Sequence, residues 1–272
     1  MAPFSLGIPR VLVVSSYDAV KDCLNINDKV FAARLGILVG EYIGYNNAML
    51  FLASYGDYWR KIRKIVINEV LSSSKLEKLR DVRVSEVKTS IKDLYSLFPI
   101  TGDQNLDFPV TVNITNWIEK LTLSLIVKMI AGKSYGRVEK GGNEEEEEAE
   151  RFKKALKDFM YISMEFVLWD AFRIPLFKWI DFQGHIKFMK RTFKDIDCVL
   201  QSWLDEHVKK RESVDFVEGN EEDFIDVMLS MMSNEDFVDG YSRETTIKAT
   251  ALSMVLVASD TTAIHLNWVM AT

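Results

Sequence analysis

The 272-residue sequence predicts a mainly α-helical protein with a small β part. Three observations support this class. Apolar residues recur with helical period through most of the chain, whereas only one short stretch near the N-terminus has strand composition. The hydrophobic content of 48% is enough for a sizeable core. No internal repeat is visible, which argues against a helical solenoid. We therefore expect residues 1–272 to form a single domain.

The predicted elements begin with a strand and continue as helices. Residues 10–14 are rich in valine, and a short helix is expected at 19–24 after the capping residues 15–18. Glycines and asparagines in 36–47 predict a long irregular connection, so residues 1–50 are expected to be a β-rich start followed by that connection. Long helical patterns follow near residues 57–70, 74–97, 111–131, 145–165, 184–212, 221–232 and 242–271.

Composition excludes several classes of protein. The net charge is −6 and the sequence has no extended basic block, which argues against nucleic acid as a partner. Cys23 and Cys198 lie far apart with no CxxC or Cys/His grouping, so we interpret them as reduced thiols rather than zinc ligands. The three histidines, His185, His207 and His265, likewise have no metal-ligand spacing.

Residues 249–270 are the only stretch apolar enough to suggest a membrane span. Asp260 lies near its centre, where insertion would cost about 2.5–3.5 kcal/mol. We interpret the stretch as a buried core helix instead. Residues 1–10 lack the basic segment and apolar stretch of a signal peptide.

The first long helix places one basic residue among its apolar residues. At about 100° per residue, Trp59, Ile62, Val66 and Ile67 form one arc, and Arg63 falls inside it. A guanidinium directed inward needs a buried anion with paired oxygens, and the indole N–H one turn away is a second donor for that anion. The alternative is a structural pair between Arg63 and a carboxylate, with Trp59 as core filler.

The last predicted helix has a polar interruption. Ala258-Ser259-Asp260-Thr261-Thr262 stands in the middle of an apolar pattern. A carboxylate followed by two hydroxyls is costly to bury unless the groups are hydrogen-bonded. Asp260 and Thr261 could satisfy each other in the core, or they could serve a reaction.

These two motifs resemble two helices of the cytochrome P-450 monooxygenases. Trp59-x-x-x-Arg63 is similar to the helix C motif, whose tryptophan and arginine bind haem propionates, and residues 258–262 are similar to the helix I motif. Residues 4–23 resemble the first strand pair and helix B of plant microsomal members. Residues 177–190 resemble the F–G region of the plant group that oxidises alkaloids, flavonoids and terpenoids. The resemblance extends along nearly the whole chain but covers only the family fold through helix I.

The resemblance implies a reaction and residue roles. The full-length protein would be a haem-dependent monooxygenase that inserts one oxygen atom of dioxygen into a hydrophobic small molecule, a plant secondary metabolite. Its electrons would come from NADPH through a reductase. Thr261 would serve in oxygen activation and Asp260 in proton delivery. Haem contacts are implied for Trp59, Arg63, Ala258 and Thr262, and substrate contacts for Phe51 and Val257.

Some family features differ or are missing. Ala258 stands where the family often has glycine, and Asp57 replaces a proline but should still begin helix C as an N-cap. Neither Cys23 nor Cys198 has the family's Phe-x-x-Gly-x-x-x-Cys-x-Gly context, so we expect the axial thiolate, the metal ligand of the haem iron, to be absent from this chain.

The N-terminal membrane anchor is also expected to be absent from this chain. The full-length protein is expected at the cytoplasmic face of the endoplasmic reticulum membrane, in contact with the membrane surface and an NADPH–cytochrome reductase. The alternatives are a non-catalytic truncated product and a helical interaction protein without haem. In the interaction protein, Arg63 would pair with a nearby acidic residue.

Overall fold

The computed structural model describes residues 2–5, 7, 10–96, 111–135, 144–213, 223–233 and 240–271. The chain divides into two compact units, each with its own core. Unit 1 consists of Met1–Lys64, Lys154–Cys198 and Asn234–Thr250; unit 2 consists of Ile65–Lys153, Val199–Ser233 and Ala251–Thr272. The expectation of a single domain stays a prediction.

Unit 1 begins with a two-stranded antiparallel hairpin, β1 (Ala2–Ser5) and β2 (Arg10–Val13), in which Ala2 lies opposite Val13. The strand predicted at 10–14 is thereby confirmed. The chain then forms α1 (Tyr17–Lys21), the π-helical turn η1 (Asp22–Ile26) and α2 (Asp28–Phe31). Within the described residues, strands are confined to this hairpin, and the segment expected to be β-rich contains more helical than strand residues.

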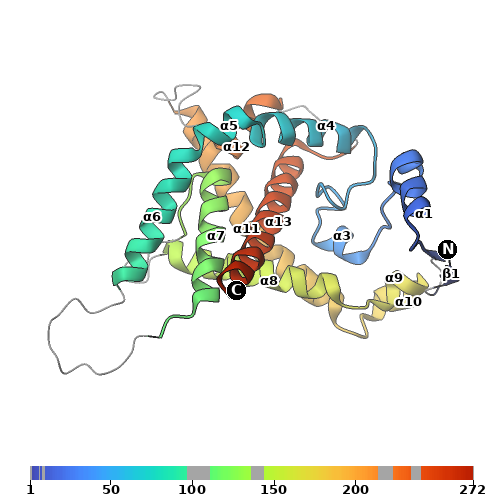
Figure 1. Ribbon diagram of the computed structural model, residues 1–272. Helices are drawn as coiled ribbons and strands as arrows, with labels where there is room; N and C mark the ends of the chain where they lie inside the picture. The colour runs from blue at the N-terminus through green and yellow to red at the C-terminus, as the bar shows by residue number, and fades with distance from the viewer. Residues whose placement is uncertain are drawn as a thin grey trace. The chain divides into compact units, whose positions relative to one another are not determined.

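The rest of unit 1 is helical. The irregular connection contains one short helix, α3 (Leu38–Tyr42), and is followed by α4 (Asp57–Ile65). Two short helices, α9 (Leu168–Phe172) and α10 (Pro175–Ile180), lie next to each other (Figure 1). The core of unit 1 is formed by fully buried side chains: Leu38, Ile43, Met49, Ile62, Phe159, Ile162, Met189 and Ile196.

Unit 2 contains the π-helical turn η2 (Val66–Val70), α5 (Ser73–Lys78), α6 (Arg80–Ser96), α7 (Ile114–Ala131) and α12 (Phe224–Met231). Helix α7 packs against both α6 and α12, and Figure 1 shows α6 and α7 side by side. An aromatic cluster fills the core, with the Phe152 and Trp203 rings 5.1 Å apart in edge-to-face contact. Side chains and backbone conformation set the ends of α7. Asn113 accepts a hydrogen bond from the Asn116 N–H at the start, and Gly132 ends the helix at φ +66°.

Three long helices contribute residues to both units: α8 (Glu144–Met164), α11 (His185–Glu212) and α13 (Arg243–Ala271). Helix α13 is continuous over 29 residues. Among the described residues it is the one helix long and apolar enough to cross a membrane, but 61% of its apolar window is buried, as in a core helix. Length and composition alone are weak evidence for a span.

Candidate functional site

Helix α4 presents Trp59 and Arg63 on its outer side. The helix begins at Asp57, as predicted, and its buried face is formed by Tyr58, Ile62 and Ile65. Trp59 is half-buried and Arg63 is exposed, so the prediction that Arg63 points into the core is wrong. The predicted arc left out Tyr58 and Ile65, whose burial centres the inward face of the helix away from Arg63. The buried Tyr58 hydroxyl donates a hydrogen bond to the carbonyl oxygen of Ala48 (2.6 Å).

Trp59 and Arg63 nevertheless form one unit. The guanidinium carbon of Arg63 lies 5.3 Å from the centre of the Trp59 ring, within the range of a cation–π contact. Arg60, three residues earlier, is paired with Asp57. Within the described parts of the chain, neither the Arg63 guanidinium nor the Trp59 N–H has a hydrogen-bond or ion-pair partner. Together they offer several unused N–H donors, a set suited to an anion with paired oxygens.

The polar segment of α13 is also exposed. The helix is buried as far as Leu256, but Val257 is 51% exposed, and Asp260, Thr261 and Thr262 are exposed as well. The predicted burial of this segment is therefore wrong for the described chain. Few of the side chains after Leu256 are buried, so this part of the helix has few packing contacts among the described residues.

The hydroxyls of this segment bond within the helix. Ser259 donates to the carbonyl of Val255 (2.7 Å) and Thr261 to the carbonyl of Val257 (2.6 Å), the expected bonds to carbonyls four residues earlier. Asp260 and Thr261 do not satisfy each other, and the Asp260 carboxylate has no partner among the residues that the structure covers. The carboxylate and the threonine oxygen are therefore open to water.

The structure assigns the predicted residues to different units. Trp59 and Arg63 belong to unit 1, as does Phe51, which lies half-buried in the turn before α4. The α13 residues from Val257 to Thr262 belong to unit 2. Val257 and Thr261 are one turn apart on α13, as are Ala258 and Thr262, so these four side chains share one face of the helix. Ala258 is half-buried on that face.

Sequence reasoning missed a buried polar cluster in unit 2. The Nε2 atom of His207 lies 2.7 Å from Oδ2 of Asp223, and its Nδ1 atom lies 2.6 Å from the carbonyl oxygen of Trp203. Nδ1 must donate because a carbonyl oxygen only accepts, and Nε2 donates to the Asp223 carboxylate in the imidazolium form, which this pair of partners favours. Burial lowers the pKa of His207, but the hydrogen bond and the charge of Asp223 outweigh it, and the net shift is upward.

Asp226 completes this cluster. Its carboxylate is 1% exposed, its backbone N–H donates to Oδ1 of Asp223 (3.0 Å), and Lys210 Nζ lies 3.3 Å from its Oδ2. The histidine and the two carboxylates offer ligand atoms within 4.8 Å of one another. The surrounding positive charges favour a structural ion network over a metal site. Asp223 as an N-cap before an apolar run was the signal that could have located the cluster.

A family model for cytochrome P-450 matches residues 3–272. The chain belongs to the cytochrome P-450 family. This confirms the family resemblance, and the mainly α fold class agrees with it. A zebrafish cytochrome P-450 structure solved with progesterone shares the fold, with a TM-score of 0.67 over 98% of this chain and 56% of that chain, at 18% identity.

Plant members of the family are much more similar in sequence. Nicotine N-demethylase CYP82E3 of Nicotiana tomentosiformis is 62% identical over 98% of this chain and 50% of its own length. Vinorine hydroxylase of Rauvolfia serpentina is 43% identical over 83% of this chain and 45% of its own length. Xanthotoxin 5-hydroxylase CYP82C4 of Arabidopsis thaliana is 39% identical over 98% of this chain and 50% of its own length. The chain spans about half the length of these relatives.

Proposed function

We propose that this cytochrome P-450 is a haem-dependent monooxygenase that inserts one oxygen atom of dioxygen into a hydrophobic plant secondary metabolite. The observation that carries the proposal is the family match over residues 3–272. The names of the plant relatives, an N-demethylase and two hydroxylases, support oxidation of small molecules.

We propose that Trp59 and Arg63 hold the haem propionates. The fit rests on their free donors, because a propionate offers the paired oxygens that a guanidinium and an adjacent indole N–H can bind together. A structural role for Arg63 in a protein without haem would require a carboxylate partner, and none is found among the described residues. When bound, the haem iron supplies the chemistry that activates dioxygen.

The face of α13 supports the other proposed roles. The hydroxyl of Thr261 donates a hydrogen bond within its own helix, and its oxygen can still accept a hydrogen bond from water. The neighbouring Asp260 carboxylate is exposed, so it can take protons from solvent and pass them to a water held at Thr261. We assign Ala258 and Thr262 to contact with the haem face. Val257 and Phe51 are assigned to the substrate.

The proposed partners follow the family and the surface. Electrons would come from NADPH through a reductase, and the exposed Lys61 and Lys64 of α4 suit an acidic docking surface. Large apolar side chains around α10 are exposed, among them Trp179 at 84% and Phe182 at 83%. We propose that they contact a membrane, the endoplasmic reticulum in the plant cell.

The experiment is spectroscopic and uses the full-length protein. The reduced carbon-monoxide complex should show the Soret band of a thiolate-bound haem, and lack of that band would defeat the assignment. Arg63→Ala should lower haem affinity about tenfold or more, the equivalent of one charge-assisted hydrogen bond. Arg60→Ala is the matched control on the same helix, because Arg60 is exposed and already paired with Asp57. Equal haem affinity of the two variants would remove Arg63 from the proposed site.

A further inference from the structure

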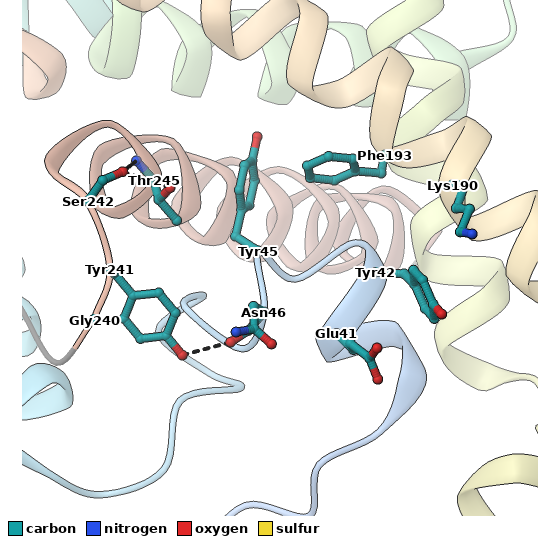
Figure 2. A pocket seen from close by; sticks show the side chains of 10 residues that line it. All are labelled: Glu41, Tyr42, Tyr45, Asn46, Lys190, Phe193, Gly240, Tyr241, Ser242 and Thr245. Carbon is teal, nitrogen blue, oxygen red and sulfur yellow. Dashed lines mark hydrogen bonds between the residues drawn. The ribbon is translucent and has the colours of Figure 1, made fainter. Parts of the chain in front are cut away.

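Unit 1 contains a cavity of about 640 Å³. This size lies within the range of small-molecule sites, roughly 300–1,000 Å³. Its walls come from α3 and the turn that follows, from α11, and from the start of α13 (Figure 2). None of the residues assigned to haem, oxygen or substrate lines it. Thr245 at its wall precedes Thr261 by more than four turns of α13.

A strained turn forms one wall of this cavity. Tyr45, Asn46 and Asn47 follow one another with φ angles of 51°, 54° and 66°. Asparagine adopts this left-handed conformation more readily than other residues with a Cβ atom, so the cost of about 1 kcal/mol or more falls mainly on Tyr45. The turn is held from two sides. The Tyr45 hydroxyl donates to Asp197 (2.8 Å), and the Tyr241 hydroxyl donates to the carbonyl of Asn46 (2.7 Å). Consecutive strain of this kind concentrates at ligand sites, where the surrounding structure maintains it.

Aromatic rings supply the apolar surface of the cavity. Tyr42, Tyr45, Phe193 and Tyr241 all line it. The Tyr45 and Phe193 rings lie 5.1 Å apart in an edge-to-face contact, and Figure 2 shows the two next to each other. Rings held in this way present flat faces and edges that suit a planar aromatic ligand.

Among the described residues, one of the lysines around the cavity is not paired with a carboxylate. Lys178 pairs with Glu41 (2.5 Å), and Lys248 pairs with Asp197 (2.7 Å). Lys190 lines the cavity with its ammonium 5.3 Å from the centre of the Tyr42 ring. Among the residues that the structure describes, Lys190 has no carboxylate partner. A ligand with a negative group would therefore find its counter-charge at Lys190.

We propose that this cavity binds a small planar aromatic carboxylate, with its ring against Tyr42, Phe193 and Tyr241 and its carboxylate at Lys190. The site is an accessory one and does not depend on haem or on the proposed oxidation. It predicts that the negative charge of the ligand, and not only its ring, determines the affinity.

The test compares two probes of the same shape on the 272-residue chain. Isothermal titration calorimetry with trans-cinnamate should show saturable one-to-one binding, and the neutral trans-cinnamamide should bind about fivefold more weakly, the upper range for an exposed ion pair. Lys190→Gln should lower the cinnamate affinity to that of the amide and leave amide binding unchanged. Lys187→Gln, an exposed lysine on the same helix that does not line the cavity, is the matched control.

Each outcome bears on the proposal. Higher salt should weaken cinnamate binding and not amide binding. Equal affinity for the acid and the amide would remove the anion site at Lys190. Loss of cinnamate binding in both lysine variants would show attraction to general surface charge instead. Absence of saturable cinnamate binding to the unmodified chain would overturn the site itself. Because no readout involves haem, these results are independent of the proposed monooxygenase function.

Discussion

Replacing Asp223 with asparagine separates the two roles of this buried side chain. Its Oδ1 atom accepts the Asp226 N–H at the start of α12 (3.0 Å), and its Oδ2 atom accepts the His207 Nε2–H (2.7 Å). Asparagine is an equally good N-cap, so the first bond can remain. Opposite His207 Nε2, the asparagine side chain would present either its NH₂ group, which is a donor, or its neutral carbonyl oxygen. Either group replaces the charged carboxylate that now accepts the bond from the imidazolium.

The size of the effect follows from these two bonds. Loss of a buried charge-assisted hydrogen bond costs about 1.5–3 kcal/mol, so Asp223→Asn should lower the free energy of unfolding by roughly 2 kcal/mol near pH 6. Asp223→Ala also removes the cap, which adds about 1 kcal/mol. In urea unfolding followed by circular dichroism, the free energy of unfolding should therefore decrease in the order wild type, Asp223→Asn, Asp223→Ala.

The pH dependence gives the sharper test. The pKa of His207 is raised in the folded state, so its contribution to stability is fully present below the unfolded value of about 6.5. That contribution is lost as the pH rises through the folded pKa. The difference in stability between wild type and Asp223→Asn should therefore be largest below about pH 6.5 and should shrink as the pH rises through the raised pKa of His207 in the folded state. A difference that stays constant across this range would refute the imidazolium assignment.

Three further changes test other parts of the structure. Gly132→Ala puts a Cβ atom at φ +66° and 3.1 Å from Oδ2 of Asp223, so the unfolding midpoint should fall by the equivalent of about 1–2 kcal/mol. Tyr45→Phe removes the hydrogen bond to Asp197 and should cost about 1 kcal/mol of unfolding free energy, with an unchanged value counting against that bond. Thr261→Val should change stability by less than about 0.5 kcal/mol because the side chain is exposed. The same variant of the full-length protein should yield less product per NADPH consumed, and unchanged coupling would remove Thr261 from oxygen activation.

Helical periodicity was sufficient to locate the long helices. The patterns near 111–131, 145–165, 184–212 and 242–271 correspond to α7, α8, α11 and α13 with end points that differ by three residues or fewer. The pattern near 74–97 is divided at Leu79 between α5 and α6. No glycine or proline marks this break, so residue preference alone could not have located it.

The site motifs could be recognised from the sequence, but their surroundings could not. The inward face of α4 includes Tyr58, whose hydroxyl donates a hydrogen bond to the carbonyl oxygen of Ala48 in a preceding turn, and an arc drawn around Trp59 did not anticipate this contact. The partnership of His207 with Asp223 joins two helices, and neither residue type specifies its partner. Contacts of this kind are set by tertiary packing rather than by local periodicity.

Trp59, which contacts Arg63, is a natural fluorescent probe next to the proposed propionate site. If haem binds at α4 as proposed, energy transfer to the porphyrin should quench the fluorescence of the half-buried Trp59. Trp203 is fully buried in the aromatic core of unit 2, and its emission reports whether that core is intact. A variant that keeps Trp59 as its single tryptophan could therefore follow haem addition, and a variant that keeps Trp203 could follow the unfolding of unit 2 in the absence of haem.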